Sequence, residues 1–372
     1  MLNVVIMSKP IAIIITPNWR DYAEKYLGAC IASIRAQDYP AEHQVFITDN
    51  ESSEASVALL KRLAPEAVIV TNRTNDGFAK GVNDSIRAAL AAGFEYIAVF
   101  NIHTVLESNC VSEMVKALES DEKIGVVQSL MLLPHESSPS PPSKGEFVVD
   151  SPLEGSTRPG RGRGDRLISS AGNATHFLGF GYCEKYREPI SSLEIGNWKL
   201  EIFYPSGSSM LFRRSALEEV GLLDEEYWMY NEDQEIGWRL RLAGWKCVLA
   251  PAAVLTNKYE FQRSIKKYYW MDRNRIISIL ICYKWPTLLL ILPPFILMEF
   301  GLVLFALKGG WLRDKLRVWR YFLQPRTWAY LHTVRNRNQR LRRVGDREIA
   351  RLISGRIWYQ EVDDFIGMSL KR

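Results

Sequence analysis

Three polar side chains in this sequence have types and positions suited to group-transfer chemistry. Asp49 and Asn101 each come at the end of a short apolar run, and Asp233 stands at the start of a helical pattern. A carboxylate can take a proton from a hydroxyl group, or accept a hydrogen bond from the imide nitrogen of uracil or thymine. Each aspartate also has an ordinary structural explanation, because Asp favours turns and acidic residues stabilise the first turn of a helix.

A glycine-flanked turn with a lysine is suited to binding phosphate groups. Gly77 and Gly81 frame it, and Lys80 falls in the first turn of a helix predicted to begin near residue 79. A helix N-terminus attracts anions, and a cation there is unfavourable unless an anion is bound. The Gly-x-x-x-Gly spacing differs from the dinucleotide fingerprint, which argues against a dehydrogenase. An Asp-Gly turn without any ligand is the alternative interpretation.

These residues need a scaffold that gathers the ends of strands, and the first 130 residues predict one. Short β-branched runs alternate with helical patterns, which is typical of an α/β fold with a mostly parallel sheet flanked by helices. We expect strands at 11–16, 44–49, 67–71, 96–101 and 124–130, and helices near 25–36, 53–63, 79–92 and 109–118. In such sheets ligands bind beyond the carboxyl ends of the strands, where the polar residues named above fall.

Composition divides the rest of the chain. Residues 134–165 are rich in Pro, Ser, Gly and Arg and predict a flexible loop, and ordinary composition returns after them. In that later part we expect a strand near 200–204, a turn at 206–208, helices at 215–220 and 231–244, and an apolar run at 247–255. We expect one α/β domain in two halves, residues 1–133 and 166–280, with the flexible loop 134–165 between them. A helical region, 281–347, and a tail, 348–372, follow.

The region 281–347 joins an apolar segment to a basic one. Residues 286–307 are long enough to cross a bilayer, but Pro293-Pro294 should break or kink a helix there. Residues 308–347 carry twelve Lys and Arg against two Asp, and a crossing would export this charge against the positive-inside tendency. We therefore expect a re-entrant or interfacial hairpin with Arg-rich helices against anionic headgroups. A buried hydrophobic helix pair is the alternative.

Overall composition narrows the class of protein. The 372 residues are 47% hydrophobic and 24% charged, as in a globular protein rather than a disordered one. Five scattered cysteines without Cys-x-x-Cys spacing exclude a disulfide framework and a cysteine-ligated zinc site, and fit a reducing compartment. Residues 1–9 lack the pattern of a signal peptide. The basic stretch lacks the aromatic platform of nucleic-acid-binding modules, so no nucleic-acid partner is expected.

Six sequence blocks follow one another in an order that resembles one enzyme family. They are Ile15-Thr16-Pro17-Asn18, Thr48-Asp49-Asn50, Asn75-Asp76-Gly77-Phe78-Ala79-Lys80-Gly81, Asn101-Ile102-His103, Ser206-Gly207-Ser208-Ser209 and Asn231-Glu232-Asp233-Gln234-Glu235. Over roughly residues 10–280 the chain resembles the inverting family 2 glycosyltransferases of the GT-A fold, especially their bacterial rhamnosyltransferase-like branch. The resemblance implies a Rossmann-like domain, here followed by a membrane-associated helical region.

The resemblance also implies roles for the matching residues. Asp233 would be the catalytic base that takes the proton of the acceptor hydroxyl, and Asp49 would hold the nucleobase. The nucleotide-sugar donor would be bound by Thr16, Pro17, Asn18, Asp49, Gly77, Lys80 and Asn101. The acceptor or the transferred sugar would lie against Ser206, Gly207, Trp228 and Glu232.

The metal-binding positions of the family are altered in this sequence. His103 stands where the family usually has a carboxylate, and Asn257 where it usually has a histidine. A neutral imidazole binds Mn²⁺ but suits Mg²⁺ poorly, so the resemblance implies a divalent cation, Mn²⁺ before Mg²⁺. A metal-independent enzyme that uses Lys80, Arg263 or Lys258 stays open, and so does a lapsed site.

The prediction is an inverting glycosyltransferase of the hexosyl or rhamnosyl type. It would move a sugar from a UDP- or dTDP-linked donor to a lipid-linked or cell-envelope glycan acceptor, in polysaccharide biosynthesis. It would lie at the cytoplasmic face of the cell membrane, attached peripherally or re-entrantly through residues 285–347. The alternative, motivated by His103 and Asn257, is a catalytically lapsed homologue that binds nucleotide or glycan as a scaffold.

Overall fold

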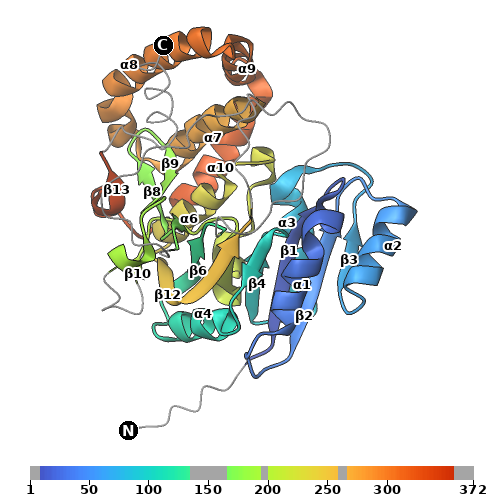
Figure 1. The fold of residues 1–372 in the computed structure, drawn as a ribbon. Coiled ribbons are helices and arrows are strands. Elements are labelled where there is room, and N and C mark those ends of the chain that lie inside the picture. The colour runs from blue at the N-terminus through green and yellow to red at the C-terminus, as the bar shows by residue number, and fades with distance from the viewer. Residues whose placement is uncertain (1–8, 135–165, 194–199, 259–265, 356–372) are drawn as a thin grey trace, which may run out of the picture.

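A mixed sheet forms the centre of the protein. The computed structural model describes residues 9–134, 166–193, 200–258 and 266–355. The strand order is β10-β12-β6-β11-β4-β1-β2-β3 (Figure 1). In that order the strands are Leu200–Glu201, Lys246–Asn257, Ile124–Leu132, Ser209–Arg213, Tyr96–Phe100, Ile11–Asn18, His43–Asp49 and Val68–Thr71. Most of the expected loop, residues 135–165, lies outside the described residues.

Both faces of the sheet are covered by helices because its strands alternate their side chains. On β1, Ile11, Ile13 and Ile15 belong to one core cluster, and Ala12 and Ile14 belong to the other. The first cluster includes residues of α1 (Gly28–Arg35), α2 (Glu54–Leu63) and α4 (Cys110–Glu119), and the second those of α3 (Gly77–Ala91), α5 (Arg214–Val220) and α6 (Glu232–Leu242). The strands and helices predicted in the first 130 residues are present within two residues at each end. The helix predicted at 25–36 is a π-helical turn, Ala23–Leu27, that continues directly into α1.

The strand β11 runs antiparallel to both of its neighbours in the otherwise parallel centre. It pairs with β4 on one side and β6 on the other, with Ser209 opposite Phe100. This pairing brings the turn before β11 to the carboxyl end of β4. Two short strands lie outside this order: β5 (Thr104–Leu106) pairs with β12, and β7 (Ile168–Ser170) pairs with β6.

A second, three-stranded sheet ties the end of the described chain to the main body. Its order is β13 (Ile353–Ser354), β8 (Asn173–His176) and β9 (Gly181–Cys183). The strand β13 lies parallel to β8, so the first residues of the expected tail pack against the second half of the domain.

The C-terminal helices form a separate layer, seen at the top of Figure 1. They are α7 (Lys266–Cys282), α8 (Trp285–Gly309), α9 (Leu312–Phe322), α10 (Pro325–Leu341) and α11 (Asp346–Ile349). The expected hairpin is wrong, because α8 continues through Pro293 and Pro294 as one helix. The two prolines remove two backbone hydrogen-bond donors. However, Thr287 before them and Glu299 after them bind residues of α11 and α9, which holds both parts of α8 in place. The buried-pair alternative is also wrong, since only 6% of the most apolar stretch of α8 is buried.

Candidate active site

Asp233 lies in the first turn of α6, and both oxygens of its carboxyl group accept backbone hydrogen bonds. Oδ2 accepts from the N–H of Gly207 at 2.9 Å, and Oδ1 accepts from the N–H of Gln234 at 2.8 Å. The side chain is half-buried. Loss of water raises the pKa of Asp233 to about 6, although the backbone donors oppose this rise. A carboxyl group with this pKa is mostly ionised at neutral pH and is a competent proton acceptor.

The turn at 206–208 joins Asp233 to the ends of the N-terminal strands. Asn101, directly after β4, donates from Nδ2 to Oγ of Ser208 at 2.6 Å, and its N–H donates to the Ser208 carbonyl at 3.2 Å. The N–H of Ser206 is bound by Oε1 of Gln128 at 2.7 Å. Three sequence blocks that are far apart along the chain therefore meet at the carboxyl end of β4.

Glu232, the residue before Asp233, has a different environment. It is 5% exposed, and its buried Oε2 has no hydrogen-bond partner among the described residues. Burial, together with the neighbouring charge of Asp233, raises the pKa of Glu232 well above its ordinary value. Of the two adjacent carboxyl groups, Asp233 is thus the one that ionises first.

The loop before α6 is strained and is held by one residue of α7. Trp228, Tyr230 and Asn231 have positive φ angles of 60°, 68° and 63°, which non-glycine residues rarely adopt. Nδ2 of the buried Asn274 lies 3.0, 3.0 and 2.7 Å from the carbonyl oxygens of Tyr227, Met229 and Tyr230. The sequence analysis missed Asn274, although a charged and amide run, Asp272 to Arg275, inside an apolar helix was a usable signal.

Asn231 differs from a conventional helix cap. It occupies the cap position of α6, but its side chain makes no capping bond. Instead Nδ2 of Asn231 donates to Oε1 of Gln234 at 2.6 Å. The left-handed backbone at this residue carries the chain from the strained loop into α6.

Trp228 joins this loop to α3 and α7. Its ring stacks on Trp270, with centroids 4.8 Å apart and planes at 19°. Its carbonyl accepts hydrogen bonds from the N–H groups of Phe78 at 2.7 Å and Ala79 at 3.2 Å. Gly77 is required here, because its φ is +86° and an added Cβ would lie 2.5 Å from the Trp228 oxygen.

The phosphate-binding role of this turn stays a prediction, and the structure gives its amides and its lysine partners within the chain. The N–H of Gly77 is bound by Oδ1 of Asn75 at 3.1 Å, so the first amides of α3 already have partners within the chain. Nζ of Lys80 lies 3.2 Å from Asp76 and 2.7 Å from Asp84, and these carboxylates balance its charge. The lysine therefore needs no bound anion to be accommodated in the first turn.

Asp49 is fully buried at the end of β2 and has three donors. Its Oδ1 accepts from Nδ2 of Asn18 at 2.8 Å. Its Oδ2 accepts from the hydroxyl groups of Ser52 at 2.8 Å and Ser56 at 2.6 Å. Beside it, Oγ1 of Thr16 accepts from the N–H of Ile102 at 3.1 Å.

Pro17 completes this group of donor-site predictions. An added Cβ at Gly81 would lie 2.2 Å from Cγ of Pro17, so α3 approaches β1 closely at this point. The structure therefore brings Thr16, Pro17, Asn18, Asp49 and Asn101 to the same edge of the sheet.

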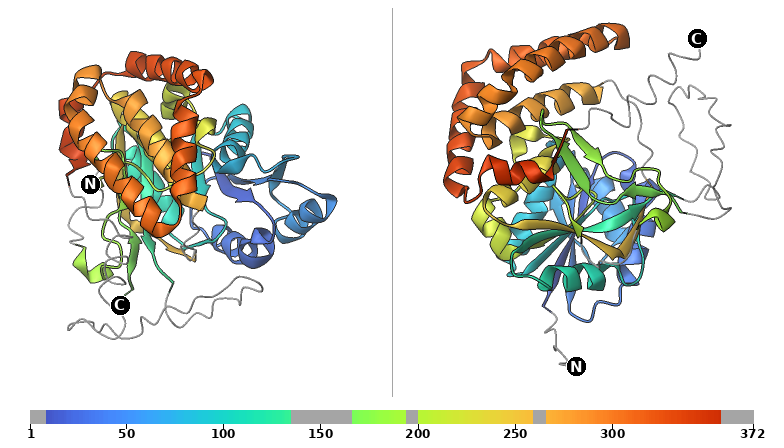
Figure 2. Two further views of the ribbon diagram at one scale, coloured as in Figure 1. Left: turned by 90° about the horizontal axis from the view of Figure 1, so that it is seen from above. Right: turned by 90° about the vertical axis from the view of Figure 1, so that its left-hand side faces the viewer.

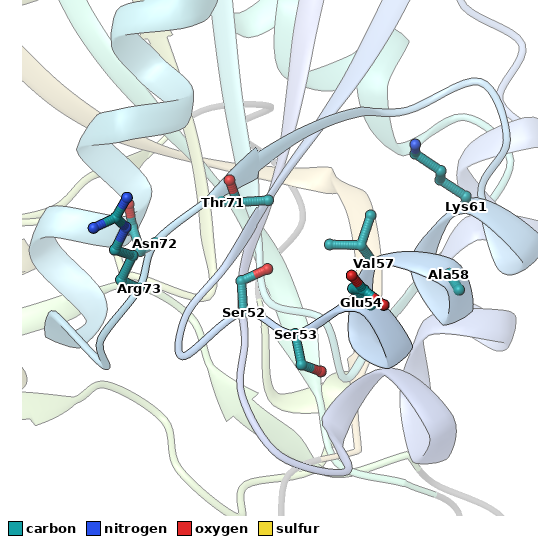
Figure 3. A pocket seen from close by; sticks show the side chains of 9 residues that line it. All are labelled: Ser52, Ser53, Glu54, Val57, Ala58, Lys61, Thr71, Asn72 and Arg73. Atoms are coloured by element: carbon teal, nitrogen blue, oxygen red, sulfur yellow. The ribbon is translucent and has the colours of Figure 1, made fainter.

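An open depression of about 590 Å³ lies beside Asp49, between α2 and the segment after β3. Figure 3 shows Asn72 and Arg73 on one side of it, the α2 residues on the other, and Ser52 between them. The residues that line it are Ser52, Ser53, Glu54, Val57, Ala58, Lys61, Thr71, Asn72 and Arg73. The sequence analysis assigned no role to Asn72 or Arg73.

The two predicted metal ligands face each other. Nδ1 of His103 and Oδ1 of Asn257 are 2.9 Å apart, and burial lowers the pKa of His103 to about 4. The backbone N–H of Lys258 donates to the His103 carbonyl at 3.0 Å, while Arg263 lies outside the described residues. The described part of the chain has no group of three or more His, Cys, Asp or Glu that could hold a metal. Because these two atoms are hydrogen-bonded to each other, an ion would have to replace that bond; the pair would then offer two neutral donors, an imidazole nitrogen and an amide oxygen, which Mn²⁺ accepts.

Comparison with known proteins identifies the family. The model of the family described as glycosyl transferase family 2 matches residues 13–221, more than half of the chain. An N-acetylglucosaminyl-diphospho-decaprenol L-rhamnosyltransferase of Mycobacterium tuberculosis is 54% identical over 48 residues, which is 13% of this chain and 16% of that protein. This chain therefore aligns with about one sixth of that relative.

Two solved structures are similar to this chain at low sequence identity. GalNAc-T7, crystallised with UDP, GalNAc and Mn²⁺, has a TM-score of 0.51 and 14% identity, with 73% of this chain and 48% of that chain covered. S. aureus TarS 1–349 in complex with UDP has a TM-score of 0.47 and 15% identity, with 89% and 88% covered. The expected GT-A fold and the expected family are confirmed, and the chain belongs to glycosyl transferase family 2.

Proposed function

We propose that the protein transfers a sugar with inversion and that Asp233 is the base. The observation that carries this proposal is the contact of Asp233 Oδ2 with Gly207, beside Asn101 and Ser208 at the end of β4. An acceptor hydroxyl would attack the anomeric carbon from the face opposite the diphosphate. As the new glycosidic bond forms and the bond to the diphosphate breaks, the hydroxyl proton passes to Asp233. Trp228 and the turn at 206–208 would border the transferred sugar.

The donor in this proposal is a UDP- or dTDP-linked sugar of the hexosyl or rhamnosyl type. Its nucleobase would lie at the depression beside Asp49, against Asn72 and Arg73. Because the Asp49 oxygens already accept three hydrogen bonds, we infer that Asp49 fixes Asn18 and Ser52 around the base, in addition to any bond of its own. Arg73 and Lys61 give this region positive charge for an anionic nucleotide.

A divalent cation, Mn²⁺ in preference to Mg²⁺, would be held by His103 and Asn257. When bound, such an ion would neutralise charge on the diphosphate leaving group. The pair supplies no negative charge of its own, so the affinity of the ion would depend on the nucleotide.

The acceptor in this proposal is a lipid-linked glycan at the cytoplasmic face of the membrane, within cell-envelope polysaccharide biosynthesis. Two observations support it. The partial relative from M. tuberculosis is named for a diphospho-decaprenol substrate. The helix α8 is long and apolar enough to cross a membrane and exposes most of its apolar surface.

The test is transfer by the purified chain from UDP- and dTDP-sugars to a lipid-diphosphate GlcNAc acceptor, with Mn²⁺, Mg²⁺ or a chelator. Asp233→Asn should lower transfer by about 10²–10⁴-fold, and NMR of the product should show the inverted anomer. Asp38→Asn is the matched control, since this exposed aspartate follows α1 at the opposite end of the sheet.

A scaffold without activity is the second candidate, favoured by the neutral pair His103 and Asn257. Calorimetry that shows UDP or dTDP binding without transfer under any cation would support it and overturn the enzyme proposal.

A further inference from the structure

One side of α8 is an exposed apolar surface. The exposed fraction is 77% for Leu290, 72% for Leu297 and 63% for Phe300. Spacings of three and four residues place most of the exposed apolar side chains on one face: Leu289, Leu290, Pro293, Ile296, Leu297, Phe300, Leu304 and Leu307. Figures 1 and 2 show α8 and α9 as the outermost layer of the helical region, farther from the sheet than α7. A continuous apolar face of this length marks an interaction surface.

The opposite side of α8 is tied to the protein at its start and at its end. Near the start, Oγ1 of Thr287 donates to Asp346 at 2.6 Å, and Asp346 also accepts from the N–H of Lys284 at 2.8 Å. Near the end, Phe305 contacts the ring of Trp311 with centroids 5.8 Å apart. Trp311 in turn stacks on Tyr268 of α7 at 4.9 Å.

The strongest tie is at the middle of α8. Oε1 of Glu299 lies 2.5 Å from Arg275 of α7, and Oε2 lies 2.7 Å from Nζ of Lys315 of α9. Asp272 completes a four-charge cluster by pairing with both basic residues at 2.7 Å. Arg275 is 1% exposed and Lys315 is fully buried, so these charges depend on one another.

These ties decide how α8 can meet a lipid bilayer. To cross the bilayer upright, α8 would have to separate from α7 and α9. Arg275 and Lys315 would then lose their ion pairs with Glu299. The crossing would also carry the Glu299 carboxylate into the hydrocarbon, where an ionised side chain is strongly disfavoured. Lying flat, α8 keeps every tie and still buries its exposed face in the headgroup and upper acyl region.

Charge around this face favours an anionic membrane over another protein. On α9 and directly after it, the exposed residues Leu316, Trp319 and Leu323 continue the apolar surface. Nε1 of Trp319 donates to Glu299 at 3.3 Å, so these residues lie next to α8. Exposed bases alternate with them and follow α9: Arg313, Arg317, Arg320 and Arg326. Bases beside a tryptophan-flanked apolar face match the interface of a bilayer with anionic headgroups.

We propose that α8 and α9 dock the protein on an anionic bilayer surface in the plane of one leaflet, without crossing it. This proposal specifies the mode of the membrane association in the proposed function. Its test measures no sugar transfer, so either proposal can fail without the other.

The first experiment is flotation of the full chain with vesicles of phosphatidylcholine alone or with one third phosphatidylglycerol. The chain should float with the anionic vesicles, and Leu289→Glu/Leu297→Glu/Leu304→Glu should reduce the bound fraction at least tenfold. Ala32→Glu/Val68→Glu/Ala91→Glu adds the same charge at exposed positions outside the C-terminal helices and should bind like the parent. Circular dichroism should show that both variants fold.

The second experiment distinguishes an α8 that lies flat on the bilayer from an α8 that crosses it. Lys284→Cys and Lys308→Cys, each with Cys183→Ser, place one thiol at either end of α8; the other four cysteines are buried. On sealed vesicles a membrane-impermeant maleimide should label both ends to the extent that it labels them in detergent. Labelling of only one end overturns the flat arrangement. A different outcome is that the chain fails to float and forms a dimer in light scattering that the triple Leu→Glu variant disrupts. That result would assign the apolar face to a second copy of the chain and overturn the membrane proposal.

Discussion

The carboxyl groups of Asp233 and Glu232 are adjacent in the sequence and have different partners in the structure. Asp233 accepts two backbone hydrogen bonds, which stabilise its charged form, while Oε2 of Glu232 is buried without one among the described residues. Raised pKa values follow for both, and the larger rise belongs to Glu232. At neutral pH, Glu232 is then a neutral acid and Asp233 an ionised base, so the two adjacent carboxyl groups can have different roles.

Transfer should lose activity as the pH falls through the pKa of Asp233. This pKa is raised to about 6, and only the ionised form can accept the proton of the acceptor. At pH 5, kcat/KM should be about tenfold below its plateau. Glu232→Gln should leave the acid limb of the profile near pH 6, because Glu232 is already neutral there. Profiles of kcat/KM between pH 5 and 8 test this, and an acid limb near pH 4 would contradict it.

Asn274 should act as a positioning residue for the loop before α6. Asn274→Ala removes the donors for three carbonyl groups of a backbone with positive φ angles, at a cost of about 1–3 kcal/mol in stability. We expect kcat to fall at least tenfold while the affinity for UDP, measured by calorimetry, changes less than threefold. Asn336→Ala, at an exposed position of α10, is the control. Equal losses of kcat and UDP affinity would show general unfolding instead.

Residue types and order predicted which side chains gather, but not what they bond to. Asn18, Asp49 and Asn101 meet because strand ends in a parallel sheet lie at one edge. The partners of Lys80 could not be deduced, because carboxylates at i±4 act either as partners or as neighbours of a bound ligand. The run around Asn274 signalled a polar role, but its acceptors could not be deduced, because they lie more than forty residues away.

At the level of elements, α3, the 228–231 loop and α7 are joined through Trp228. We expect Gly77→Ala to disturb this junction, because the new Cβ would lie 2.5 Å from the Trp228 oxygen. Gly93→Ala is a matched control, since its φ of +88° imposes similar backbone strain with nothing within 4 Å. Gly93→Ala should lower the free energy of unfolding by about 1–2 kcal/mol. Gly77→Ala should lower it further and reduce transfer at least tenfold. Urea unfolding and transfer assays measure both quantities. Equal effects of Gly77→Ala and Gly93→Ala would contradict a role of Gly77 in joining α3 to Trp228.

The cluster around Glu299 should dominate the attachment of α8. Glu299→Ala leaves Arg275 and Lys315 with a single carboxylate between them, and breaking such a buried pair costs about 3–5 kcal/mol. Lys185→Ala removes an exposed pair with Glu188 and should cost less than about 1 kcal/mol. Denaturation followed by circular dichroism in detergent compares the two. A loss from Glu299→Ala no larger than the control would contradict the role of the cluster.

The two prolines of α8 show where local rules fail at this scale. A proline pair predicts a break, because two backbone donors are lost. Here Thr287 before the prolines and Glu299 after them are each bound to the neighbouring helices, which holds both parts on one axis. Those partners, Asp346 and Lys315, are remote in sequence, so periodicity gives no sign of them. The Glu235–Arg239 pair is a similar case: its i,i+4 spacing is typical of surface pairs, yet both residues are fully buried.

For the whole molecule, a parallel sheet for the first strands was predictable and the later insertions were not. β-branched runs with intervening helices predict parallel strands, and β4, β1, β2 and β3 pair in this way. The antiparallel β11, which brings the Gly207 turn to the site, enters from a segment more than a hundred residues later than β4. Pairing at that distance depends on the packing of both halves, and no local pattern in the sequence encodes it.

The uneven charge of the chain should appear in how salt affects membrane binding. The chain has a formal net charge of +5, and residues 308–347 alone contribute +10, so attraction to anionic lipid is localised at the helical end. Raising NaCl from 0.05 to 0.5 M shortens the Debye length to a few ångströms and should weaken flotation with phosphatidylglycerol vesicles by at least tenfold. Arg313→Glu/Arg320→Glu/Arg326→Glu should bind weakly at both salt concentrations. Residual binding should persist in each case, because the apolar face of α8 is insensitive to salt. Binding that is independent of salt would mean that the apolar face acts alone, and the alternation of bases with apolar residues on α9 would then have no part in docking.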